Sequence, residues 1–200
     1  MMADRYDSYR ALTKEKTEGV DFEIERRLSS SSVAFIAPHG GGIEFMTAEI
    51  ADALAGTEDT YYAFKGTTAK GNGDLHVTST NFDELKCLEA IKDRKAVVAI
   101  HGLSDSSSNH EIDIGGRNDA VRDAIASALV NAGFNASVVS SGDHAALSSQ
   151  NICNRGTERG GVQIELTAAL RKRIRDKPQL LRTLVASIRG AIVDDTSSAQ

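Results

Sequence analysis

The chain has 200 residues, of which 40% are hydrophobic and 26% are charged, and its formal net charge is -5 with an isoelectric point near 5.5. A chain of this length and composition can bury the core of one globular domain without disulfides or structural metals. Because nucleic-acid-binding proteins usually carry a basic excess, the acidic balance argues against nucleic acid as a ligand.

The sequence also argues against a membrane protein. No segment approaches the ~20 consecutive apolar residues of a membrane span. Residues 1–19 carry charges throughout and lack the apolar run of a signal sequence. Cys87 and Cys153 lie far apart without CxxC spacing, which predicts free thiols. We therefore expect a cytoplasmic protein, and no pattern sets its oligomeric state.

The chain begins with a polar segment, residues 1–32, which we interpret as a lead-in to a single domain over residues 33–200. Within the lead-in, residues 22–28 show a short helical pattern that a serine run follows. Two fully apolar runs come next, VAFIA over 33–37 and AVVAI over 96–100. Both runs are typical of buried strands in a largely parallel sheet, and a His-Gly pair closes each of them.

The rest of the chain alternates between helical and strand-like patterns. Helical periodicity covers residues 47–54, 82–93, 117–131 and 168–192, the last with a break expected at Pro178. Further strand candidates are residues 61–64, 75–78, 111–114, 136–139 and 162–166. This alternation predicts an α/β three-layer sandwich with a mixed, mostly parallel central sheet.

Two histidines, His39 and His101, follow directly on the predicted buried strands. Ligands bind beyond the carboxyl ends of the strands in open α/β sheets, so these side chains lie where chemistry is expected. Glu44 follows His39 in a glycine-rich turn that can fold it back towards the same point. Two imidazoles and one carboxylate form a ligand set of hydrolytic zinc enzymes, which keep a fourth position open. The alternative is that both histidines are hydrogen-bonded structural residues.

A further carboxylate, Glu165, lies within or just beyond an apolar strand-like segment over residues 161–166. Partial burial beside a cation would tune the pKa of this carboxyl group for service as a general base towards an attacking water. The alternative is an edge-strand glutamate that faces solvent by period-two alternation.

Two arginines, Arg117 and Arg155, lie in Gly- and Asn-rich turns rather than on charged helix faces. A guanidinium group matches a carboxylate with two parallel hydrogen bonds, so a carboxylate-rich substrate would explain them. Surface salt bridges would explain them equally well. The basic residues from Arg171 to Lys177 lie in a helical pattern, and we interpret them as a solvated face without a function.

Two rival motifs are incomplete in this chain. The HGGG run over residues 39–42 matches the oxyanion loop of lipases and esterases, but the GxSxG nucleophile elbow is missing from the sequence. The glycines at 40–42 and 71–73 complete neither GxGxxG nor GxxxxGK[ST]. The sequence therefore predicts neither a serine hydrolase nor a nucleotide-binding protein.

Six motifs occur in order along the chain: APHGGGIE over 37–44, TAEIA over 47–51, LHVTSTNFDE over 75–84, IGGRN over 114–118, NICNRG over 151–156 and GVQIEL over 161–166. Together they resemble the phage-type poly-γ-glutamate hydrolases, whose bacterial members are often labelled phage-related replication proteins. The match spans roughly residues 33–175. It implies a zinc-carboxypeptidase-like α/β fold and the cleavage of γ-glutamyl amide bonds.

The resemblance also implies roles for single residues. It places one zinc ion on His39, Glu44 and His101, the same set that the strand ends suggest, and it makes Glu165 the general base. By the same resemblance some residues anchor substrate carboxylates, and others line the cleft or support its loops. The anchors are Arg117, Asn154 and Arg155, and the cleft residues are His76 and Asn81.

The sequence departs from the family pattern at Phe45-Met46, which replace a Pro-Gly turn beside Glu44. We expect a zinc-dependent hydrolase of γ-glutamyl amides with a carboxylate-rich substrate such as poly-γ-glutamate, cytoplasmic and released on lysis if it is phage-borne. Two alternatives stay open. One is a zinc carboxypeptidase or deacylase that acts on a small N-acyl or peptidoglycan-type amide. The other is a non-enzymatic, phage-related interaction module.

Overall fold

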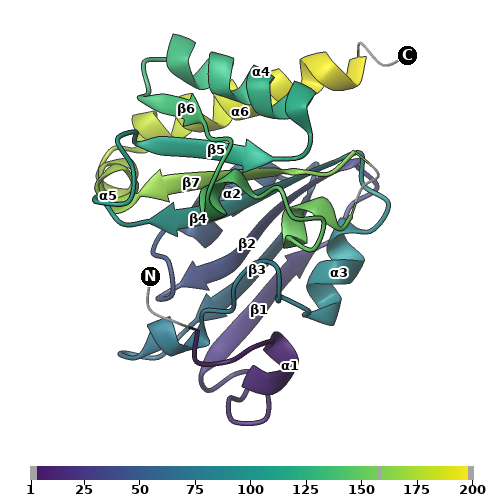
Figure 1. Ribbon diagram of the computed structural model, residues 1–200, viewed down its shortest axis with the longest axis vertical. Coiled ribbons are helices and arrows are strands. Elements are labelled where there is room, and N and C mark those ends of the chain that lie inside the picture. Colours follow the sequence, from purple (N-terminus) through teal and green to yellow (C-terminus); the bar gives the residue numbers. More distant parts are fainter. Residues whose placement is uncertain (1–3, 157–158, 198–200) are drawn as a thin grey trace.

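The computed structural model describes residues 4–156 and 159–197, which form one twisted central sheet with helices on both faces (Figure 1). The strand order is β1-β3-β2-β4-β7-β5-β6. In chain order the strands are β1 (Phe22–Arg27), β2 (Val33–Gly41), β3 (Thr60–Gly66), β4 (Ala96–Leu103), β5 (Ile112–Gly116), β6 (Ala136–Val138) and β7 (Val162–Thr167). Strand β2 pairs in parallel with β3 and β4, as does β4 with β7 and β5 with β6. The pairs β1–β3 and β5–β7 are antiparallel, so the predicted mixed, mostly parallel sheet is confirmed.

The helices form the two outer layers of the sandwich. They are α1 (Tyr9–Leu12), α2 (Thr47–Ala55), α3 (Leu85–Ile91), α4 (Asp119–Asn131), α5 (Ala168–Asp176) and α6 (Pro178–Ser197). Short 3₁₀ turns are η1 (Asn72–Leu75), η2 (Asp143–Ala145) and η3 (Ile152–Asn154). The predicted break at Pro178 is confirmed, because α5 ends at Asp176 and Pro178 opens α6, a position where its missing N–H costs nothing.

Side chains alternate between two apolar layers, as the period of a strand requires. Phe35 and Ile100 face the layer formed with α2, α4, α5 and α6. Ile36 and Ala99, their neighbours along the chain, face the second layer, to which α1 and α3 contribute. The parallel strands are buried on both faces, which explains why their sequences are continuous apolar runs. The predicted three-layer α/β sandwich is therefore confirmed.

Two predicted elements are wrong. The helical pattern over residues 22–28 is strand β1, in which Phe22 is buried and pairs with Gly66 of β3. Charged residues on both sides of Ile24 keep the exposed edge of this strand polar. The resulting spacing of apolar and charged residues resembles that of a short amphipathic helix. The strand expected over residues 75–78 is instead the end of η1 followed by an extended segment outside the sheet.

The segment before Val33 packs against the rest of the chain. Tyr6, Leu12 and Phe22 are buried in the same apolar cluster as Ile36 of β2. This segment closes the lower edge of the sheet in Figure 1. Of the helices that the structure describes, none is both long and apolar enough to cross a membrane.

The burial of Phe22 yields a test of the position of β1. Its ring packs against Phe64 with centroids 4.9 Å apart, so Phe22→Ala should lower the free energy of unfolding by about 3–5 kcal/mol. Val20, which is 70% exposed just before the strand, is the matched control, and Val20→Ala should change it by less than about 0.5 kcal/mol. Urea unfolding of both variants measures the difference, and equal effects would contradict the placement of β1.

Candidate active site

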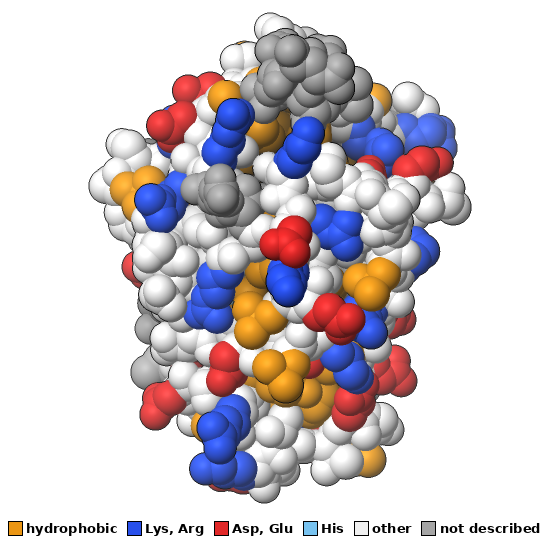
Figure 2. Space-filling model, turned by 90° about the vertical axis from the view of Figure 1, so that its right-hand side faces the viewer, with side chains coloured by type: hydrophobic (Ala, Val, Ile, Leu, Met, Phe, Trp, Pro, Cys, Tyr) orange, Lys and Arg blue, Asp and Glu red, His pale blue; other side chains and the backbone are white. Residues whose placement is uncertain are grey.

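The histidines gather at one end of the sheet. His39 and His101 lie at the carboxyl ends of β2 and β4, and His76 packs on the ring of His39. The remaining two, His110 and His144, both contact Asp113 of β5. Figure 2 shows the other end, where β2, β4 and β7 begin: acidic and basic side chains are mixed there, and no histidine is visible.

The loop after β2 turns Glu44 back onto His39. The pairing of β2 with β3 shifts register between Ala37 and Gly40, and Gly41 takes a positive φ of 62°. The Glu44 amide then donates to the His39 carbonyl oxygen at 2.9 Å, and Thr47 Oγ1 donates to the carbonyl oxygens of both residues. The turn therefore fixes the direction of the Glu44 side chain.

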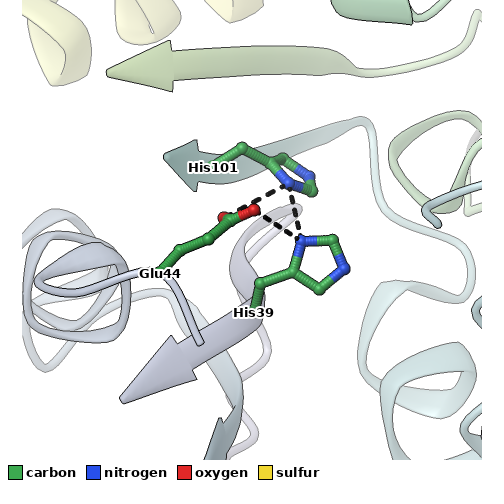
Figure 3. Close-up of side chains that lie close together, drawn as sticks. All are labelled: His39, Glu44 and His101. Atoms are coloured by element: carbon green, nitrogen blue, oxygen red, sulfur yellow. Dashed lines mark hydrogen bonds and ion pairs between the residues drawn. The ribbon is translucent and has the colours of Figure 1, made fainter. Parts of the chain in front are cut away.

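The three predicted metal ligands meet at one point (Figure 3). His39 Nδ1 lies 3.1 Å from Glu44 Oε1 and 3.2 Å from His101 Nδ1, and His101 Nδ1 lies 3.8 Å from Glu44 Oε2. Ligand atoms on a tetrahedral zinc ion at 2.0–2.2 Å lie roughly 3.3–3.6 Å from one another. The three side chains therefore fit a single zinc ion without large movement.

The far sides of both imidazole rings are held by the segment after η1. His39 Nε2 donates to the Val77 carbonyl oxygen at 2.8 Å, and His101 Nε2 lies 3.3 Å from Ser79 Oγ. Because a carbonyl oxygen only accepts, the neutral His39 ring carries its proton on Nε2 and turns the lone pair of Nδ1 to the centre. Such a bond on the far nitrogen is typical of histidines that bind a metal.

Electrostatics favour a positive charge between these side chains. Burial opposes a charged His39, but the Glu44 carboxylate outweighs it, so the pKa of His39 is raised. Burial also opposes ionised Glu44, yet the imidazoles, with His39 first, lower its pKa to about 2. Burial lowers the pKa of His101 to about 3. An ionised carboxylate thus faces two ring nitrogens, a donor set that a divalent cation satisfies.

His76 belongs to the same site. Its ring centroid lies 4.0 Å from that of His39, and its Nε2 lies 3.7 Å from Glu44 Oε1. The other ring nitrogen, Nδ1, contacts Asp4 Oδ1 at 2.6 Å, while Asp4 Oδ2 accepts from the Thr78 amide. The N-terminal segment thus holds His76 against the cluster.

Glu165 lies beside His101 on the neighbouring strand. The Cα atoms of these two residues are paired in the β4–β7 register. Both side chains lie on the face of the sheet opposite to the one that carries Ile164. Glu165 is buried, and Gln163 Nε2 donates to its Oε1 at 3.0 Å. It therefore does not face solvent, and the alternative of an exposed edge glutamate is wrong.

The side chains of Asn154 and Arg155 form hydrogen bonds with backbone groups. The amide nitrogen of Asn154 donates to the carbonyl oxygens of Ala146 and Ser148, and its oxygen accepts from the Gly161 amide. Arg155 donates to three carbonyl oxygens, those of Thr80, Phe82 and Gln150. These bonds give both residues a structural role, and binding of substrate by them stays a prediction.

The structure does not bring Arg117 to the cluster. It follows Gly116, which pairs with Val162 at the start of β7, whereas Glu165 lies towards the other end of that strand. The direction of β5, antiparallel to β7, is the cause. Asn81 is exposed, and its backbone amide donates to the Thr78 carbonyl oxygen at 2.7 Å; its role in the cleft or in the supporting loops stays a prediction.

Arg171 was assigned to a solvated face, and this assignment is wrong. The residue is 7% exposed, and its guanidinium donates to the carbonyl oxygens of Leu166, Leu103 and Phe45. It thereby joins the ends of β7 and β4 to the residue after Glu44. Gly102 makes room, because a Cβ atom there would lie 2.5 Å from Arg171 Cζ. The Gly102 amide also donates to Glu44 Oε2 at 2.8 Å.

Phe45 and Met46 complete the loop in place of the expected Pro-Gly turn. Met46 has a φ of 72°, a left-handed conformation that a glycine adopts without strain. Phe45 is 41% exposed, and the Arg175 guanidinium lies 5.5 Å from its ring centroid. The backbone thus keeps a glycine-like turn, and the side chain adds an aromatic rim beside Glu44.

The comparison with family models decides what kind of protein carries this site. The model of the poly-gamma-glutamate hydrolases matches residues 6–185. The chain belongs to this family. The resemblance seen in the sequence is therefore confirmed, and the match begins within the segment before Val33.

Individual relatives agree with the family. The SPbeta prophage-derived protein YoqZ of Bacillus subtilis (strain 168) is 34% identical over 173 residues, which are 86% of this chain but only 62% of YoqZ. The structure of a bacteriophage poly-gamma-glutamate hydrolase superposes with a TM-score of 0.90 at 29% identity and covers 98% of this chain and 99% of that one. The zinc-free structure of YndL gives 0.80 at 31% identity, over 86% and 84% of the two chains.

A more distant likeness concerns the fold alone. A metallo-carboxypeptidase from Burkholderia cenocepacia has a TM-score of 0.52 at 11% identity and covers 90% of this chain and 61% of that one. The predicted zinc-carboxypeptidase-like fold is thereby confirmed.

Arg171 yields a test of the link between strands β4 and β7 and the Glu44 loop. Arg171→Met keeps an apolar stem but leaves three carbonyl oxygens without their donor, so the free energy of unfolding should fall by about 3–5 kcal/mol. Lys172→Met, at the exposed neighbouring residue, should change it by less than about 0.5 kcal/mol. Denaturant unfolding compares the two variants, and an unchanged Arg171→Met protein would disprove the structural link.

Proposed function

We propose that the chain is a zinc-dependent hydrolase of γ-glutamyl amide bonds, with one zinc ion on His39, Glu44 and His101 and with Glu165 as general base. The observation that carries the proposal is the group of ligand atoms within 4.8 Å of one another at the ends of β2 and β4. A buried glutamate lies in register with one of these ligands. Membership of the poly-gamma-glutamate hydrolase family supports the reaction.

Glu165 has the surroundings of a proton-carrying carboxyl group. Zinc bound nearby would polarise the scissile carbonyl and acidify a water. Glu165 would take a proton from the attacking water and give it to the departing amine. Burial, together with the charges of Glu44 and Asp113, raises the pKa of Glu165 well above its ordinary value, and a cation held by the neighbouring ligands would lower it towards the ionised form that a general base needs. The hydrogen bond from Gln163 holds Glu165 Oε1, which leaves Oε2 for the proton transfers.

The relatives support a class of substrate. The similar bacteriophage protein is a poly-gamma-glutamate hydrolase, and we propose the same class of polymer here. The prophage origin of YoqZ supports a phage-borne role for this chain. A carboxypeptidase or deacylase would use the same ligands, so a substrate profile separates it from the proposed enzyme. The cytoplasmic location, with release on lysis, and the lack of nucleic-acid binding stay predictions.

The metal site predicts a graded loss of zinc affinity. The wild-type protein should bind one zinc ion, and His101→Ala should abolish binding at micromolar metal. Ser79→Ala removes only the group on the far side of the His101 ring, so it should weaken binding by about 10–100-fold. Competition with a chromophoric chelator measures all three proteins, with Ser104→Ala, at an exposed serine, as the control. A wild-type protein without zinc would favour the non-enzymatic interaction module.

The general base predicts a loss of turnover without loss of metal. Glu165→Gln is isosteric and should lower kcat on poly-γ-glutamate by about 10²–10⁴-fold while zinc binding is retained. Glu23→Gln, on the exposed face of β1, should leave kcat unchanged. The release of new amino groups reports the reaction, and equal activity of Glu165→Gln and wild type would remove Glu165 from the mechanism.

A further inference from the structure

A second histidine cluster adjoins the proposed active site. Asp113 accepts three contacts: from Ser108 Oγ at 2.7 Å, from His110 Nδ1 at 3.3 Å and from His144 Nδ1 at 3.0 Å. Among the described residues, the group whose ligand atoms lie close enough for a metal ion is the one at the ends of β2 and β4.

The sheet register brings the cluster to Glu165. Asp113 of β5 pairs with Glu165 of β7, which pairs in turn with His101 of β4. The three side chains form a row across neighbouring strands on one face, because Ile112, Ile114 and their counterparts point to the other face. Adjacent strands lie about 4.8 Å apart, so Asp113 is one strand away from the proposed base.

His144 is fixed at this place by the packing of η2 on β5. A Cβ atom at Gly115 would lie 2.2 Å from the His144 carbonyl oxygen, so only glycine permits the contact. Ala146, which ends the turn, takes a φ of 49°, a left-handed conformation that is rare for alanine. Such strain persists where the surrounding structure demands it, and it often marks functional loops.

The bond to Asp113 orients the imidazole of His144. Its Nδ1 donates to the buried carboxylate, so Nε2 lies on the opposite side of the ring, and the side chain is 22% exposed. His144 is therefore held on Asp113, the residue paired with Glu165 in the sheet, with its second ring nitrogen turned away from Asp113.

The proposed substrate needs a hydrogen-bond donor. A γ-glutamyl polymer has one free carboxylate on each unit. The side chains of Glu44 and Glu165 are also acidic, so they do not attract this carboxylate. Arg155 and Arg171 donate to backbone carbonyl oxygens, and Arg117 lies towards the other end of the sheet. A histidine anchored on a carboxylate is a donor of suitable charge.

We infer that His144, oriented by Asp113, binds the free carboxylate of the γ-glutamyl unit next to the bond that is cleaved. This inference rests on the proposed function and adds to it the residue that distinguishes a γ-glutamyl amide from an uncharged amide. Asp113 acts as a positioning residue, because it touches His144 rather than substrate.

The test uses two substitutions of His144, each of which keeps a hydrogen-bond donor near only one of the two ring nitrogens. His144→Asn retains an amide near Nδ1 for Asp113 but removes the outer donor. His144→Gln places an amide near Nε2. The substrates are a γ-glutamyl oligomer with free α-carboxylates and the same oligomer with α-carboxamides. In His144→Asn the ratio of kcat/KM for the two substrates should fall by about tenfold to hundredfold, mainly through KM of the charged oligomer. His144→Gln should recover part of the preference.

Two controls separate the outcomes. His110→Gln, on the other side of Asp113, should keep the wild-type ratio, and the zinc content of each variant should be unchanged. An unchanged ratio in His144→Asn, an equal loss in His110→Gln, or a larger loss in His144→Gln than in His144→Asn would each overturn the inference. A wild-type protein that binds zinc but cleaves neither oligomer would instead refute the proposed function.

Discussion

The candidate site depends on the register in which strands β4, β7 and β5 pair. This register aligns His101, Glu165 and Asp113 in one row. A slip by one residue would turn all three side chains to the opposite face. Ile100 and Ile164 prevent the slip, because they are fully buried against the helical layer on that face. The packing energy of one face of the sheet therefore sets the positions of the chemical groups on the other.

Backbone contacts at the end of the sheet complete this arrangement. The guanidinium of Arg171 joins two strand ends to the loop that carries Glu44, and the Gly102 amide donates directly to the carboxylate. Gly102, which has no side chain, thus contacts Glu44 through its amide and leaves room for the guanidinium of Arg171. Each imidazole also contacts a group on its far side, so the donor set at the centre is oriented before any ligand binds.

The sequence predicted what depends on strand ends and left out what depends on strand order. Apolar runs predicted the central strands, and the positions just after them led to His39 and His101. The role of Asp113 stayed hidden, because it lies inside a predicted strand and its partner strand is unknown from one sequence. Arg117 was expected near the substrate because of its Gly- and Asn-rich turn and the family resemblance. The antiparallel direction of β5, which has no local signal, places it towards the other end of the sheet. Arg171 fits a helix pattern, and its burial results from the neighbouring strand ends.

The contact between Asp4 and the segment after η1 has a thermodynamic consequence. Asp4 joins His76 to the Thr78 amide, and His76 lies on the ring of His39. Local opening of the N-terminal segment and ligand binding at His39 are thus two equilibria with a shared contact surface. If opening of this segment weakens binding at the imidazoles, linkage requires that binding suppresses the opening by the same coupling free energy. In that case Asp4 contributes to the free energy of ligand binding, although it is not one of the predicted ligands.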